Sequence, residues 1–134
     1  MPLEPVQPPG WKPPRGYVNG MKSPVDARLV FLAGQVAWDA EQRLVGAGDF
    51  VAQFRQALAN VIAVVETAGG KPDDIASLTV FVTDKQQYLA STKELGVVWR
   101  DLMGRHYPAM ALVEVAGLVE EGALLEIQGI AAVA

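Results

Sequence analysis

Two polar side chains near the C-terminus have a spacing that would let them act together. Glu126 and Gln128 lie within residues 125–130, a run that is predicted to be a strand. Residues two apart share one face of a strand, so both side chains are expected on the same side of a sheet. A carboxyl group held there can accept and deliver a proton, as general acid–base catalysis requires. The alternative is an ordinary solvent-facing strand, on which both would be surface polar residues.

The cations of the chain offer a second kind of chemistry. Arg105 and His106 follow Gly104, which is expected to end a helix, and a cation is favoured there by the helix dipole. His106 is the only histidine in the chain. Its two interpretations are a structural cation at a helix end and a proton shuttle in a pocket. With one histidine and no cysteine, the sequence predicts no metal site.

The elements that must position these residues follow from hydrophobic periodicity. Apolar residues recur every three to four positions over 49–68, where Asp49 can cap a helix and Gly69 with Gly70 can end it. A second helix is expected over about 85–103, capped by Asp84 and ended by Gly104. Strands are expected at residues 16–21, 28–33, 75–83, 109–116 and 124–133, with a small strand or a bulged loop at 44–48.

The order of these elements predicts an α+β fold, with a single mixed β-sheet and two helices packed on one face. The strand at residues 28–33 is predicted to be buried, and it is apolar on both faces. Two helices can cover only one face of the sheet. Another copy of the chain is therefore expected to cover the other face.

The beginning of the chain has a different character. Prolines occupy positions 2, 5, 8, 9, 13 and 14, and proline is disfavoured in the interiors of helices and sheets. Residues 1–15 are therefore predicted to form an extended arm, and residues 16–134 the folded domain. A flexible tail is the alternative. Trp11 favours an anchored arm, because a free indole in a tail would leave a large apolar surface in water.

Composition restricts the classes of function. The net charge is −4 and the 11 lysine and arginine residues are scattered, which argues against a nucleic-acid partner. The N-terminus lacks the apolar stretch of a signal peptide, and no apolar run approaches the roughly 20 residues of a membrane span, so no membrane partner is expected. The absence of cysteine fits a reducing compartment, and a cytoplasmic location is predicted.

Several segments, taken in order, resemble the RidA/YjgF family of imine/enamine deaminases. Residues 31–35, 53–60, 108–115 and 125–131 match the family patterns F-V-S-G-Q, Q-x-x-Q-A-L-x-N, P-A-R-x-x-V-E-V and V-E-I-E-A-I-A. Further matches are Tyr17-x-x-Gly20, Ala68-Gly69 and the segment from Asp74 to Asp84. Each piece is weak alone, but the ordered set is specific. The resemblance implies a RidA-like (chorismate-mutase-like) homotrimer with a cleft at each subunit interface, a small-molecule substrate, and no cofactor or metal.

The resemblance also assigns roles to residues. Glu126 takes the position of the family glutamate that acts as general acid and base or orients water. Tyr17 takes that of a pocket tyrosine whose hydroxyl can bond substrate or water, or it is a half-buried strand residue. Gly34 with Ala33 matches a bend where backbone N–H groups approach the ligand, and Ala33 replaces the family serine. Glycine can also serve there as a purely structural bend.

Three further positions complete the expected site. Trp38 is expected either to form an aromatic wall of the cleft or to pack at a subunit seam, and Gln128 replaces a second glutamate. Met110 stands where the family has the arginine that binds a substrate carboxylate. A charged hydrogen bond contributes about 1.5–3 kcal/mol, and a thioether cannot form a bidentate pair with a carboxylate. Met110 can still line an apolar pocket.

Hydrolytic deamination of a reactive imine or enamine, on a substrate other than simple 2-aminoacrylate, is therefore the predicted function. The protein would be a cofactor-independent hydrolase. A non-catalytic protein that binds a small ligand in the same cleft is the alternative, and the loss of the arginine and the serine favours it. Ribonuclease activity, claimed for some members of the family, fits the acidic composition poorly.

Overall fold

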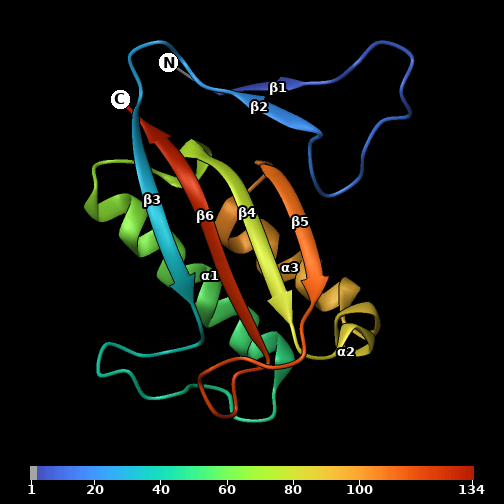
Figure 1. Cartoon of the computed structure of the whole chain (residues 1–134), viewed down its shortest axis with the longest axis vertical. Helices are drawn as coiled ribbons and strands as arrows, with labels where there is room; N and C mark the ends of the chain where they lie inside the picture. The colour runs from blue at the N-terminus through green and yellow to red at the C-terminus, as the bar shows by residue number, and fades with distance from the viewer. Residues whose placement is uncertain (1–2) are drawn as a thin grey trace.

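The main sheet has four strands in the order β3-β6-β4-β5 (Figure 1). The computed structural model describes residues 3–134, so Met1 and Pro2 of the predicted arm lie outside the described residues. The strands are β3 (Arg28–Gln35), β4 (Ile75–Val82), β5 (Ala109–Glu114) and β6 (Leu125–Val133). Strand β6 is antiparallel to β3 and β4, whereas β4 and β5 are parallel. The predicted mixed sheet is confirmed.

Helix α1 (Phe50–Thr67) forms where the apolar periodicity predicted it. The carboxylate of Asp49 caps the first turn by accepting a hydrogen bond from the backbone N–H of Ala52 at 3.1 Å. The helix ends before Gly69, whose φ of 91° is a left-handed conformation that glycine adopts without strain. A short 3₁₀ turn, η1 (Pro72–Asp74), then leads into β4.

The second predicted helix is divided in two, which differs from the single helix expected over 85–103. Helix α2 (Lys85–Ala90) ends at Ser91, and α3 (Thr92–Met103) begins directly after it. The N–H of Ser91 bonds to the carbonyl of Tyr88, three residues back instead of four. Serine competes for backbone hydrogen bonds and favours helix boundaries over interiors, so the break falls at a suitable residue. Together α2 and α3 form the crossover that a parallel strand pair requires.

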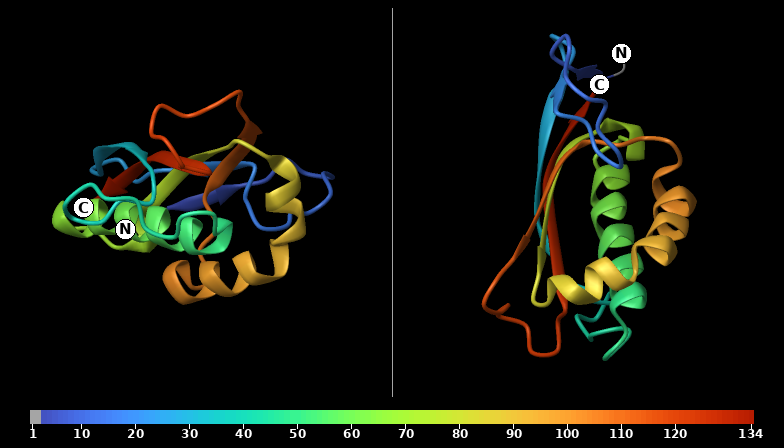
Figure 2. Two further views of the ribbon diagram at one scale, coloured as in Figure 1. Left: turned by 90° about the horizontal axis from the view of Figure 1, so that it is seen from below. Right: turned by 90° about the vertical axis from the view of Figure 1, so that its right-hand side faces the viewer.

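The helices pack on one face of the sheet only (Figure 2). Along β4, Val80 is buried on the helix side, whereas its neighbour Phe81 is half-buried on the other side. We call the side of the sheet away from the helices the open face. In the described chain no helix lies over it.

Strand β3 differs from its prediction as a buried strand. It is an edge strand, and Leu32 is its only buried residue. On the open face, Leu29 is 56% and Phe31 73% exposed, and Val113 of β5 is 40% exposed. The apolar sequence predicted burial correctly only for the helix side, because residues 3–134 leave these side chains exposed on the other side.

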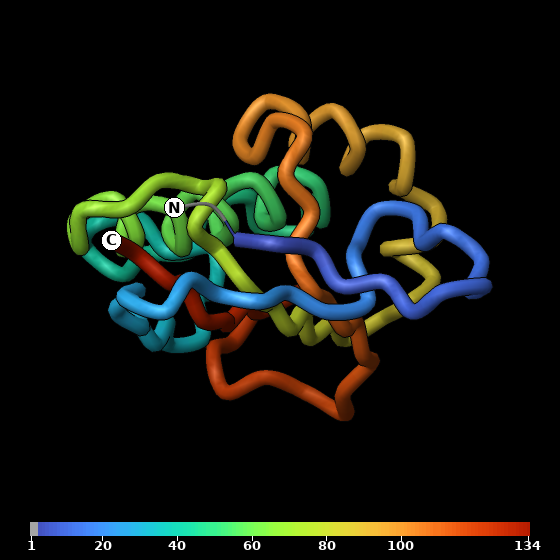
Figure 3. Tube along the Cα trace, turned by 90° about the horizontal axis from the view of Figure 1, so that it is seen from above, coloured from blue at the N-terminus to red at the C-terminus, as the bar shows by residue number. Residues whose placement is uncertain are grey.

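The N-terminal segment forms an arm across one end of the sheet (Figure 3). Its strand β1 (Glu4–Val6) pairs antiparallel with β2 (Gly20–Lys22) as a separate two-stranded sheet, so the strand predicted at 16–21 is shortened and shifted. Three residues after the arm, the backbone N–H of Val18 bonds to the carbonyl of Pro108 at 3.1 Å, which joins this part of the chain to the main sheet. The side chain of Trp11 is 61% exposed, so the chain alone does not anchor it.

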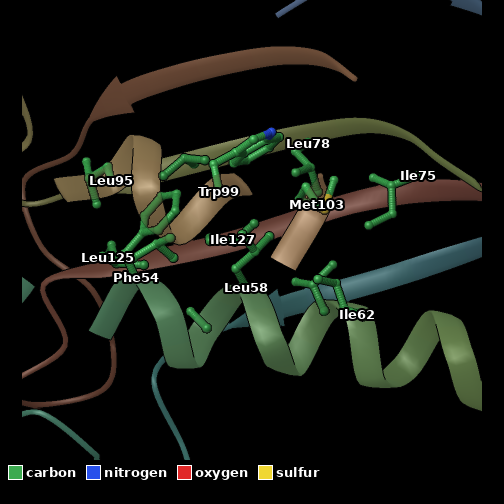
Figure 4. Close-up of a cluster of buried hydrophobic side chains, with 14 of the residues drawn as sticks. Phe54, Leu58, Ile62, Ile75, Leu78, Leu95, Trp99, Met103, Leu125 and Ile127 are labelled. Atoms are coloured by element: carbon green, nitrogen blue, oxygen red, sulfur yellow. The ribbon is translucent and has the colours of Figure 1, made fainter. Parts of the chain in front are cut away.

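The hydrophobic core lies between the sheet and the two long helices. The apolar residues predicted for one face of α1, from Phe50 to Val65, are all buried. Figure 4 shows side chains from α1 and α3, among them Phe54, Leu58 and Trp99, packed against Ile127 and Leu78 of the strands. This packing fixes the helices over one side of the sheet and leaves the residues of the open face for other contacts.

Candidate functional site

Glu126 lies on the open face, beside an irregularity in strand β3. The pairing of β3 with β6 shifts register between Leu32 and Gln35, so Ala33 and Gly34 form a bulge. A Cβ atom added to Gly34 would lie 2.8 Å from Cδ of Glu126, and closer still to Oε2. Only glycine leaves room for the carboxylate in this position. Glycine is required here because the Glu126 side chain lies so close to the backbone of residue 34, and not because of the backbone conformation, since the φ of Gly34 is not positive.

The surroundings of Glu126 leave its carboxylate available to a ligand. Within residues 3–134 it takes part in no ion pair, and its side chain is half-buried. Its cross-strand neighbour on β4 is Phe81. Gln128 lies two residues on, exposed on the same face, and Ala33 is exposed beside it. The structure thus brings four of the predicted residues together: Ala33, Gly34, Glu126 and Gln128.

Trp38 lies in the loop that follows β3. Its indole N–H donates to Oε2 of Glu120 at 2.6 Å, which ties this loop to the connection between β5 and β6. The predicted element at 44–48 is a loop, in which Leu44 forms an isolated bridge with Trp38. Asp39, the residue after Trp38, accepts a hydrogen bond from the backbone N–H of Arg43 at 2.9 Å, which lowers the pKa of its carboxyl group below the ordinary value.

Gln53 of α1 is a residue whose importance the sequence did not reveal. It is fully buried. Its Nε2 donates to the carbonyls of Gly46 at 3.2 Å and Gly122 at 3.1 Å, and its Oε1 accepts from the N–H of Leu124 at 2.8 Å. These bonds hold the segment that enters β6 two residues before Glu126. Gln53 therefore positions the start of the strand that carries the carboxylate.

Two further amides of α1 hold the loop on the other side of the site. Gln56 Nε2 donates to the carbonyl of Trp38 at 3.1 Å, and Asn60 Nδ2 donates to the same carbonyl at 2.8 Å. Asn60 also donates to the carbonyl of Val36 at 3.2 Å. The spacing of Gln53, Gln56 and Asn60 places the three amides on one side of the helix. This spacing is the signal in the sequence for the three amides, and it is also part of the family pattern Q-x-x-Q-A-L-x-N.

Met110 and Tyr17 lie elsewhere in the chain. Met110 pairs with Leu78 and packs against the hydrophobic core on the helix side of the sheet, opposite to the side of Glu126. Tyr17 is 40% exposed and precedes Val18, which bridges to Ala109 at the start of β5. The start of β6 lies at the other end of the sheet from the arm (Figure 1). Within one chain, the structure does not bring Met110 or Tyr17 to Glu126.

Comparison with known proteins decides the family. A family model described as endoribonuclease L-PSP matches residues 11–133. A RutC family protein of Pyrococcus horikoshii is 31% identical over 120 residues, which cover 90% of this chain and 89% of that protein. The chain belongs to the RidA/YjgF family. The resemblance found in the sequence is confirmed.

Solved structures of RidA/YjgF proteins share the fold. YyfB of Yersinia pestis, a conserved Rid family protein of unknown function, has a TM-score of 0.87 and 29% identity, covering 99% of this chain and 100% of that one. RidA from an Antarctic Psychrobacter has a TM-score of 0.67 and 31% identity, covering 87% of this chain and 88% of that one. The YyfB match therefore extends over nearly all of the chain, including the arm.

The cations of this RidA/YjgF chain take structural positions or remain at the surface. His106 Nε2 donates to the carbonyl of Ile75 at 2.7 Å, and the indole N–H of Trp99 donates to the carbonyl of His106 at 3.0 Å. Arg105 is exposed. Both line an open cavity of about 460 Å³ beneath the arm. Among residues 3–134, no three histidine, aspartate or glutamate side chains are grouped so that they could hold a metal ion. None of the helices there has the length and hydrophobicity of a membrane span.

Proposed function

We propose that the protein hydrolyses a reactive imine or enamine, with Glu126 as the group that carries the proton. The observation that supports this most directly is the placement of its carboxylate against Gly34, free of any ion pair within residues 3–134. A glutamate that served only structure would be expected to pair with a cation or a hydrogen-bond donor. Membership of the RidA/YjgF family supports the same role.

The proposed reaction needs no cofactor. An enamine first takes a proton on carbon and loses one from nitrogen, which gives the imine. Glu126 in its acid form then donates a proton to the imine nitrogen, and as a carboxylate it takes a proton from the attacking water. The oxygen of water bonds to carbon to form a carbinolamine. The C–N bond then breaks, ammonia leaves, and a carbonyl compound remains.

The proposed site lies between copies of the chain. Glu126 is on the open face, whereas Met110 packs on the helix side of the sheet. Tyr17 precedes the bridge at the start of β5, at the end of the sheet away from Glu126. These residues can therefore share a ligand with Glu126 only across a subunit interface. The side chains of Leu29, Phe31 and Val113 form exposed apolar surface on the open face, and burial of this surface favours association with another copy. A homotrimer is the proposed assembly, with one site at each interface.

Other residues have proposed binding roles at this site. The bulge at Ala33 and Gly34 would present backbone N–H groups to the ligand, and Gln128 would offer its amide from the same face. Trp38 would contribute an aromatic wall, although its indole N–H is already bonded to Glu120. Tyr17, with a 40% exposed side chain, would reach the ligand from the neighbouring chain.

The test combines assembly with activity. Light scattering should give a mass near three times the 14.3 kDa of the chain. Imines generated enzymatically should release ammonia faster in the presence of the protein. Glu126→Gln should lower kcat by roughly 10²–10⁴-fold without changing the mass, because glutamine cannot carry the proton. Glu121→Gln, at an exposed glutamate of the preceding turn, is the matched control. Near-normal turnover by Glu126→Gln would exclude this residue as the acid and base.

The alternative is a protein that binds a small ligand without converting it. Met110 in place of the arginine and Ala33 in place of the serine favour this function. It predicts saturable ligand binding with no ammonia release from any imine tested. Ribonuclease activity is named in the description of the matching family model. The net charge of −4 disfavours it, and RNA binding that survives moderate salt would support it.

A further inference from the structure

The Met110 pocket is a cavity on the helix side of the sheet. It has a volume of about 210 Å³, and Met110, Leu112, Tyr88, Trp99, Tyr107 and Gly96 are among the residues that line it. None of the described residues that line it carries a charge. A carboxylate placed inside would lose its hydration without gaining a cationic partner, which is strongly unfavourable. The Met110 pocket is therefore suited to an uncharged group.

One wall of the Met110 pocket is a fixed pair of aromatic rings. Trp99 and Tyr107 are stacked, with ring centroids 5.8 Å apart and an interplanar angle of 7°. The indole N–H of Trp99 is bonded to the carbonyl of His106, which holds the ring in orientation. Flat rings favour offset-stacked or edge-to-face neighbours at similar separations. The thioether of Met110 also makes favourable contacts with aromatic rings. This wall therefore favours a planar group.

Gly96 keeps the Met110 pocket open. It lies in the interior of α3, where glycine is less favourable than alanine. A Cβ atom at this position would meet nothing within 4 Å, and its φ is not positive. Neither packing within the chain nor backbone conformation therefore requires glycine here. A side chain at residue 96 would instead occupy space beside the cavity.

We propose that the Met110 pocket binds the planar, uncharged side group of the substrate, of the size of a phenyl ring. An engineered apolar cavity of about 150 Å³ holds benzene, so a volume of 210 Å³ is sufficient for one such ring. This inference rests on the proposed function, because it names the class of imine: one derived from an aromatic amino acid. The carboxylate of such an imine would remain outside the Met110 pocket.

The test compares two imines that share the carboxylate and the C=N group and differ by a phenyl ring. An amino-acid oxidase produces them from phenylalanine and from alanine, with oxygen reduced to hydrogen peroxide and catalase added to remove it. The wild-type protein should favour the phenylalanine imine in kcat/KM by roughly 10- to 100-fold, as burial of one ring implies. Equal rates, or a preference for the alanine imine, would overturn the proposal.

Three variants, one of them a control, distinguish the contribution of the Met110 pocket from that of the rest of the site. Gly96→Leu should fill the cavity and lower the ratio of the two kcat/KM values at least tenfold. Val97→Leu changes the next residue on α3, which is 50% exposed and does not line the cavity, so the ratio should stay unchanged. Met110→Arg should lower the ratio by placing a cation in the cavity and favouring the smaller imine. A ratio unaffected by Gly96→Leu would contradict the proposal.

A binding measurement distinguishes failure of this inference from failure of the proposed function. Benzyl alcohol, added to protein labelled with ¹³C at its four methionine methyl groups, should shift the resonance of Met110, identified by its loss in Met110→Leu. If that resonance shifts but no imine is hydrolysed, binding in the Met110 pocket is supported and the proposed deaminase activity is contradicted. If imines are hydrolysed through Glu126 but the Met110 resonance does not shift, the pocket proposal is wrong. This result is expected if a side chain from another copy of the chain fills the cavity.

Discussion

Two glycines, one on each side of the sheet, differ in the space that surrounds them. At Gly34, on the open face, an added methyl group would meet the carboxyl group of Glu126. At Gly96, beside the Met110 pocket, it would meet nothing within 4 Å. In the region around Glu126, the buried amide of Gln53 holds the start of β6 by hydrogen bonds. The region around Gly96 is apolar and has unfilled space. The region proposed to carry the proton is therefore held in one geometry, whereas the region proposed to bind the side group of the substrate has unfilled space.

A substitution at Gly34 should have a large effect on activity. Gly34→Ala should displace the Glu126 carboxylate and lower kcat/KM for the best imine by about 10²-fold, the effect expected of a 1 Å misplacement. The free energy of unfolding should change little, because the clashing atoms are the end of a flexible side chain. Steady-state kinetics and urea denaturation measure the two effects. Gly117→Ala, at an exposed glycine with open space around it, is the control.

A substitution at Gln53 tests whether its amide holds the segment that leads to Glu126. Gln53→Met preserves the approximate volume but leaves the N–H of Leu124 and the carbonyls of Gly46 and Gly122 without this partner. The free energy of unfolding should fall by roughly 2–3 kcal/mol, since a buried group left unsatisfied costs about 1–3 kcal/mol. Gln86→Met, at an exposed position of α2, should have little effect. Equal stability of the two variants would show that water replaces the amide.

A substitution at Gly96, beside the Met110 pocket, should increase stability instead of lowering it. Gly96→Ala should raise the free energy of unfolding by about 0.5–1 kcal/mol, because alanine is favoured over glycine in a helix interior and its methyl group meets open space. Thermal denaturation of the two proteins at equal concentration measures the difference. A loss of stability would mean that another copy of the chain approaches α3 closely at this residue.

The smallest expected effect concerns the loop next to Trp38. The backbone N–H of Arg43 lowers the pKa of Asp39, so the stabilisation is present above the ordinary pKa of aspartate and is lost as the pH falls through the lower, folded-state pKa. Asp39→Asn should therefore lower the melting temperature slightly at neutral pH. The difference from wild type should shrink as the pH falls below about 4. A difference that does not depend on pH would assign the effect to the shape of the side chain and not to its charge.

Much of the fold could be predicted from the sequence because its signals are local. The periodicity of α1, its cap at Asp49 and its end at Gly69 depend on residues within a few positions of one another. The break at Ser91 was missed, since a single serine inside an apolar pattern gives only a weak signal. The exposure of Phe31 was missed because an apolar sequence predicts burial without saying what covers it.

The candidate site was predictable only in part. Glu126, Gly34 and Gln128 were placed together by strand periodicity and by the family pattern, and the structure brings them together. Gln53 bonds to Gly122 and Leu124 over 69 and 71 positions, so the helical spacing of the amides does not identify these partners. Met110 was expected beside Glu126, and its side of the sheet follows from the parallel pairing of β5 with β4, which the sequence does not encode locally.

Strand β3 has a consequence for how the protein is made and stored. It is an edge strand of eight residues with large apolar side chains on its uncovered side, and such edges tend to pair with other chains and aggregate. Under the proposed assembly, association with two further copies protects this face, so the free energy of folding includes a term that depends on protein concentration. The melting temperature should rise on concentrating the protein, and dilute or newly synthesised chains are the form most exposed to misassembly.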